Sequence, residues 1–168
     1  MFRVAACRDV RHIRYRRTSD LRPYLGGIVG RHFGLGLPQA EFDRSVARGE
    51  IHQALALGEQ LQNLAQQSQD PALLLQAYHA TGPILGLIGD WASSRRQLEE
   101  AVTYYDRQAH ADHNSLYGGH DPCVCCQGYG AKALWMLGYP DQAMQLGNNA
   151  LALARDLKHP TSLAHTQF

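Results

Sequence analysis

Six histidines and cysteines crowd into one short stretch of the chain, and these are the residue types best suited to chemistry. They lie within residues 110–126 and are His110, His113, His120, Cys123, Cys125 and Cys126. Imidazole nitrogens and thiolates are the usual ligands of zinc, and a loop rich in them could bring four together around one ion. The pattern therefore raises the question of a metal site, with the candidate ligands His110, His113, His120, Cys123 and Cys126.

The spacing of these residues argues against a metal site, because the cysteine run fits no standard zinc knuckle. If Pro122 opens a helix, Cys123 and Cys126 share one helical face and Cys125 points elsewhere. Free cysteines are also common small core residues. We therefore expect a packed helix start beside a solvated histidine loop, and no metal or other cofactor.

A cysteine nucleophile is a second kind of chemistry that this stretch could support. His120 is close in sequence to Cys123, and the dipole of a helix that begins at Pro122 would lower the pKa of the Cys123 thiol. No third residue stands out to orient the histidine, and the chain has no Gly-x-x-x-x-Gly-Lys-Ser/Thr phosphate loop. We expect a protein that is not an enzyme, and metal or thiol catalysis on residues 110–126 remains an alternative.

A repeated pattern predicts the elements that would position these residues. Three glycines, Gly49, Gly89 and Gly138, each precede an amphipathic stretch. Five residues after each glycine stands a small residue, Ala54, Ser94 or Ala143. Twelve residues after it stands Leu61, Ala101 or Ala150. Repetition at such a period is typical of helical hairpins that bury their apolar faces by stacking on one another.

The helical signals begin at Gln39 and continue to the end of the chain. We predict helices over residues 40–48, 51–67, 71–88, 91–105, 122–138 and 141–157, and the opening turns of another over residues 161–168. Asp70-Pro71 and Asp121-Pro122 are typical helix starts, whereas Pro83 should kink or break its helix. The aromatic residues at helical spacing, Trp135 and Tyr139 among them, are expected to pack between hairpins.

These elements predict an all-α tetratricopeptide-like solenoid of about two and a half hairpins, formed by residues 39–168. Because the last hairpin is incomplete, we expect this domain to be truncated at its C-terminus and to belong to a longer array. Residues 1–38 are expected to be a basic, poorly ordered arm. The first 48 residues contain ten arginines and four acidic residues, whereas residues 49–168 contain six basic and eleven acidic residues.

Charge and hydropathy narrow the class of partner and the location. The basic arm could contact nucleic acid, but a disordered leader is the simpler interpretation, so nucleic acid is not the expected partner. Arg8, Arg11 and Arg14 interrupt the N-terminus before a secretory signal could form, and no run is apolar enough to span a bilayer. We expect a cytoplasmic protein with no membrane partner.

Two runs match the tetratricopeptide spacing of a small residue, a turn glycine, a large apolar or small residue and an alanine. They are Gly82, Gly89, Leu98 and Ala101, and then Ala131, Gly138, Ala143 and Ala150. Over about residues 46–168 the chain resembles the C-terminal tetratricopeptide regions of large bacterial regulators with an AAA-type ATPase module, many of which also carry an adenylate/guanylate cyclase or DNA-binding domain. The segments that carry this resemblance are residues 70–80, 117–122, 134–143, 150–155 and 159–160.

The resemblance implies a protein-interaction or regulatory module whose catalytic domains lie elsewhere. Its partner would be a protein, a peptide or a neighbouring domain of a longer polypeptide, and a stand-alone adaptor is the alternative. The candidate partner-binding residues are Gln76, His79, Gln127 and Lys132. An open apolar face at the end of the array also predicts self-association. Gly58, Gly147 and Pro83 stand where a typical repeat has larger or more helix-forming residues.

Overall fold

The structure, a computed structural model, describes residues 36–108 and 119–166, and in these two ranges all of its regular secondary structure is helical. Residues 1–35, most of the predicted basic arm, lie outside the described part. The helices are α3 (Gly36–Arg48), α4 (Ile51–Ser68), α5 (Pro71–Leu87), α6 (Trp91–Thr103), α7 (Pro122–Met136), α8 (Pro140–Asp156) and α9 (Pro160–His165).

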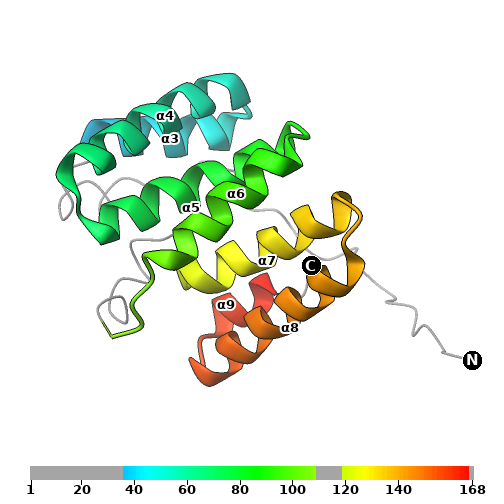
Figure 1. Cartoon of the computed structure of the whole chain (residues 1–168). Coiled ribbons are helices and arrows are strands. Elements are labelled where there is room, and N and C mark those ends of the chain that lie inside the picture. Colours follow the sequence, from blue (N-terminus) through cyan, green and yellow to red (C-terminus); the bar gives the residue numbers. More distant parts are fainter. Residues whose placement is uncertain (1–35, 109–118, 167–168) are drawn as a thin grey trace, which may run out of the picture.

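Consecutive helices pack as hairpins that stack in chain order (Figure 1). The hairpins are α3 with α4, α5 with α6, and α7 with α8, and α9 packs on both α7 and α8. Each hairpin contacts the next, and α5 also contacts α7 directly. The prediction of an all-helical chain is therefore confirmed for the described residues, whereas the tetratricopeptide-like superhelix remains a prediction.

The three repeat glycines lie in the turns that connect the two helices of each hairpin. Gly49, Gly89 and Gly138 have φ angles of +73°, +87° and +85°, a region that glycine enters without steric cost. The small residues five positions later are buried, with exposed fractions of 0% for Ala54, 1% for Ser94 and 6% for Ala143. The residues twelve positions later, Leu61, Ala101 and Ala150, are fully buried. The repeat in the sequence thus marks equivalent core positions.

The predicted helix starts are also confirmed. The carboxylate of Asp70 accepts a hydrogen bond from the Ala72 backbone N–H at 2.9 Å, and that of Asp121 accepts one from Val124 at 3.0 Å. Pro83, however, does not break its helix, since α5 continues to Leu87. One proline costs about 3 kcal/mol, which packing of α5 against α4, α6 and α7 can offset.

Several predicted details differ from the structure. Helix α3 begins at Gly36 and not at Ala40. Trp135 is 59% exposed and Tyr139 is 46% exposed, although aromatics at this spacing are usually buried between hairpins. Both lie near the turn between α7 and α8, where the Arg95 guanidinium of α6 lies over the Tyr139 ring at 5.5 Å from its centroid. No helix in the described ranges combines the length and the apolar character needed to cross a membrane.

Candidate histidine and cysteine site and its neighbouring groove

The structure places the predicted chemical residues in two different environments. His110 and His113 lie outside the described residues, whereas His120 is half-buried in the segment that leads into α7. Cys123, Cys125 and Cys126 are all buried in the first turns of α7. Cys126 belongs to a core cluster with Leu75, Leu98 and Ala101, which confirms the expectation of a packed helix start.

Three side chains from three elements converge at one point: His79 of α5, His120, and Cys125 of α7. The Nε2 atoms of His79 and His120 are 3.1 Å apart. A ligand atom from each of the three residues lies within 4.8 Å of the other two. We call these three residues the His–Cys cluster. It differs from the predicted ligand set, because Cys125 and not Cys123 or Cys126 lies near His120.

His79 was expected to contact a partner, and the structure corrects this expectation. Its side chain faces His120 from the middle of α5, and only 9% of the residue is exposed, so it has little surface to offer. No sequence pattern associates His79 with His120, which is 41 residues later. Only the packing of α5 against α7 brings them together.

His165 of α9 borders the His–Cys cluster. Its Nε2 lies 3.3 Å from the Cys125 sulfur, and its ring stacks on that of His120 with a centroid distance of 4.8 Å and an interplanar angle of 8°. The ring of Tyr129 lies edge-on to the ring of His165, with a centroid distance of 5.6 Å. His165 therefore connects the cluster to the next helix.

Burial shifts the pKa values of the cluster residues toward their neutral forms. Burial, with the charges that His120 and His165 would carry, lowers the pKa of His79 to about 3. Burial, with the negative charge of Asp121, raises the pKa of Cys123 and of Cys125 to about 12. The expected lowering of the Cys123 pKa by the helix dipole is therefore wrong. Protonated thiols are poor nucleophiles, and neutral imidazole is the form that binds metal ions.

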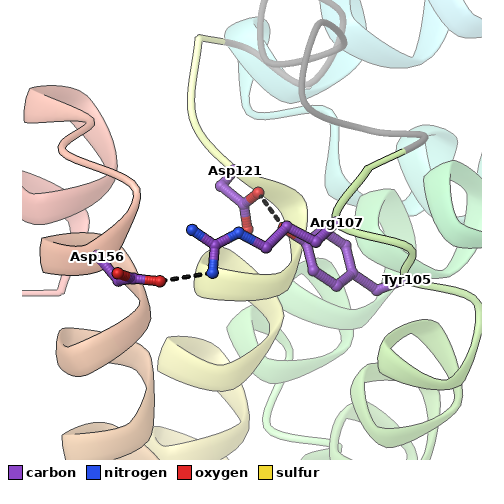
Figure 2. Close-up of polar contacts among 4 residues, drawn as sticks. All are labelled: Tyr105, Arg107, Asp121 and Asp156. Carbon is purple, nitrogen blue, oxygen red and sulfur yellow. Dashed lines mark hydrogen bonds and ion pairs between the residues drawn. The ribbon is translucent and has the colours of Figure 1, made fainter.

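A buried carboxylate fixes the segment that carries His120 (Figure 2). Asp121 accepts hydrogen bonds from the Tyr105 hydroxyl at 2.8 Å and from the Val124 N–H at 3.0 Å. Its own N–H donates to the Ser162 hydroxyl of α9 at 2.8 Å. Because His120 immediately precedes Asp121, these contacts hold its backbone between α6, α7 and α9.

A groove of about 580 Å³ opens between α7, α8 and α9 on the far side of His165. This volume is within the usual range for binding clefts in proteins. Lys132 is exposed in the groove and forms no ion pair with any residue that the structure describes. The lining residues are Gly128, Tyr129, Ala131, Lys132, Trp135, Gly147, Ala150, His165 and Thr166.

Two glycines of the groove lie in helix interiors without a packing reason inside the described structure. A Cβ atom added to Gly128 would meet nothing within 4 Å, and one added to Gly147 would lie 3.8 Å from the Ala131 Cβ. In contrast, a Cβ on Gly58 would lie 2.2 Å from the Thr81 Cγ2. A mid-helix glycine costs about 1 kcal/mol relative to alanine. The space above Gly128 and Gly147 is therefore open to another molecule.

The remaining predicted partner-binding residues lie away from this groove. Gln76 and Gln127 are half-buried, and the side-chain oxygen of each is buried without a hydrogen-bond partner in the described part of the chain. Gln127 lines a smaller pocket of about 160 Å³ between α6, α7 and α8. Of the four predicted residues only Lys132 reaches the groove. The sequence feature that could have indicated the groove is the pair of glycines in helix interiors, Gly128 and Gly147.

Comparisons with known proteins show one distant similarity. The chain is 22% identical over 107 residues to an uncharacterized protein of Rhizobium meliloti (strain 1021). The matched region is 64% of this chain and 10% of that protein, so the chain spans only about a tenth of the length of this relative. No protein-family model matches the chain, and no solved structure matches it significantly.

Proposed function

We propose that this chain is a protein-interaction module that binds one amphipathic helix of a partner in the groove between α7, α8 and α9. The observation that carries the proposal is the open floor formed by Gly128 and Gly147, where a Cβ atom would have space. Small residues at such positions let two helices approach closely, and binding of a helix in an apolar groove is a common mode of peptide recognition.

The lining residues specify the chemistry of this helix. Small apolar side chains would face Gly128 and Gly147, and the exposed indole of Trp135 would supply an aromatic anchor of the kind that dominates binding energies. An acidic side chain on the same helix would pair with Lys132, because that ammonium group has no acidic partner among the described residues. The proposed ligand is therefore an amphipathic helix with small apolar residues and one acidic position on the face that enters the groove.

The wider context follows from the family resemblance. We place the module in the tetratricopeptide-like part of a bacterial signalling ATPase, cyclase or transcriptional regulator, as a regulatory scaffold. The helix that it binds would belong to a neighbouring domain or to a separate protein. The hairpins stacked in chain order support this assignment, since stacked helical pairs form extended binding surfaces.

The test is a selection of helical peptides on the full chain, with the Gly147→Leu variant as the counter-target. Leucine would fill the groove while improving helix propensity, so the variant should fold. We expect selected peptides that contain small residues and an acidic position, and that bind Gly147→Leu at least about tenfold more weakly by fluorescence anisotropy. Trp135→Ala should weaken binding by about 30-fold or more, as for an interface hot spot.

Leu87→Ala is the matched control, because Leu87 is 64% exposed on α5 and lies outside the groove. This variant should bind the selected peptides like the unmodified chain. Peptides that bind all variants equally would overturn the proposal. Sedimentation analysis of the unmodified chain and of Gly147→Leu tests whether the groove binds a second copy of the chain. A dimer that the Gly147→Leu substitution dissociates would show that it does, and this result would contradict the proposal.

A further inference from the structure

We propose that the His–Cys cluster is a zinc site, with Nε2 of His79, Nε2 of His120 and Sγ of Cys125 as its three protein ligands. The three ligand residues come from α5, from the segment before α7 and from α7 itself, and one donor atom of each lies within 4.8 Å of those of the other two. A site assembled from separate elements would join the second and third hairpins. The proposal does not depend on the groove or on its ligand.

The distances are close to those of a tetrahedral centre. Zinc lies about 2.0–2.1 Å from nitrogen and 2.3 Å from sulfur, so two donors of one tetrahedral ion are about 3.3–3.6 Å apart. The two Nε2 atoms are already 3.1 Å apart. The nitrogen–sulfur pairs need to approach by about 1.2 Å at most, which small rotations of the side chains can supply.

A hydrogen bond between the two imidazoles is the simplest competing explanation. It requires one ring to donate and the other to accept, and it accounts for the contact between His79 and His120. It does not involve the Cys125 sulfur, which lies at the same point inside a buried region. Convergence of two imidazoles and a thiol is the arrangement that metal binding requires.

The donor set selects the metal. The three donors include no carboxylate or carbonyl oxygen, so calcium and magnesium are excluded, whereas two nitrogens and one sulfur suit Zn²⁺. On binding, the zinc–sulfur bond replaces the sulfur–hydrogen bond of Cys125, and the proton passes to solvent. Three protein ligands leave a fourth coordination position, for which His165, with its Nε2 3.3 Å from the same sulfur, is a candidate.

The test is the titration of the full chain, freed of metal by a chelator, with Zn²⁺ alone and then with Co²⁺. We expect one Zn²⁺ per chain by elemental analysis, and a thiolate-to-cobalt charge-transfer band in the absorption spectrum. Cys125→Ser should abolish this band, and His120→Asn should weaken zinc affinity at least about 100-fold. Cys123→Ser, a buried cysteine on the same helix, is the matched control and should bind like the unmodified chain.

A double variant, His110→Asn with His113→Asn, separates this site from the ligand set suggested by the sequence. It should retain full zinc binding. Loss of binding in this variant, or binding that survives both Cys125→Ser and His120→Asn, would overturn the proposal.

Because His120 is only half-buried, the His120→Asn variant should fold, which circular dichroism can verify. Zinc should also raise the melting temperature of the unmodified chain by about 5 °C, and of His120→Asn by much less.

Discussion

The polar contacts of Asp121 and Asp156 differ in how much they contribute to the stability of the fold, because only Asp121 is buried. Asp121 is 3% exposed and satisfies the Tyr105 hydroxyl and the first turn of α7. Asp156 pairs with Arg107 at the surface, where the side chains are 64% and 53% exposed (Figure 2). Water and salt screen the surface pair, whereas a buried group that loses its partner pays the full desolvation penalty.

We therefore expect Asp121→Ala to lower the free energy of unfolding by about 2–4 kcal/mol, since it removes a helix cap and the acceptor of a tyrosine hydroxyl. The matched change Asp156→Ala should alter the free energy of unfolding by no more than about 0.5 kcal/mol. Urea denaturation of both variants measures the difference. Equal losses in the two variants would show that Asp121 does not fix the segment before α7.

The same residues show what the sequence could predict about the site. The Asp-Pro pairs predicted the starts of α5 and α7 correctly, because helix capping and the fixed φ angle of proline act within one helical turn. The sequence also singled out His120, since it stands among cysteines. His79 and His165 could not be linked to it, because their proximity depends on how α5, α7 and α9 pack, and that information is not local.

At the scale of helices, glycines serve two different purposes, which spacing alone does not distinguish. Gly58 lies where α4 meets α5, and a Cβ there would overlap the buried Thr81 side chain at 2.2 Å. Gly128 faces the groove, where nothing lies within 4 Å. The sequence identified Gly58 and Gly147 as departures from a typical repeat, but only the packing separates a glycine required by a neighbour from one that leaves space.

Alanine substitution should therefore change stability in opposite directions at these two positions. Gly58→Ala should lower the free energy of unfolding by about 1–3 kcal/mol, because Thr81 must move within a packed core. Gly128→Ala should raise the free energy of unfolding by about 0.5–1 kcal/mol through helix propensity. Thermal unfolding followed by circular dichroism compares them directly. Destabilisation by Gly128→Ala would mean that the groove is closed in solution.

At the scale of the whole molecule, the His–Cys cluster lies where the last two hairpins and α9 meet. His79 comes from α5, Cys125 from α7 and His165 from α9, and the contacts of His165 reach both the cluster and the groove. The stability of the whole domain should therefore depend on the charge state of this cluster. The hairpin order was predictable from the repeat, whereas this meeting point was not, because it involves positions outside the repeat pattern.

Acid should destabilise the metal-free protein through His79. Its pKa falls from 6.5 in a solvated chain to about 3 in the folded protein, because of burial and of the neighbouring His120 and His165. Between these values the unfolded chain binds a proton that the folded chain does not, so stability is complete above pH 6.5 and decreases as the pH falls. At pH 5 the loss of stability is about 2 kcal/mol.

Urea denaturation in the presence of a chelator measures this loss at pH 7 and pH 5. His79→Gln should reduce this loss of stability, whereas the control His52→Gln, at an exposed position of α4, should leave it unchanged. Equal stability of the unmodified chain at both pH values would contradict the prediction.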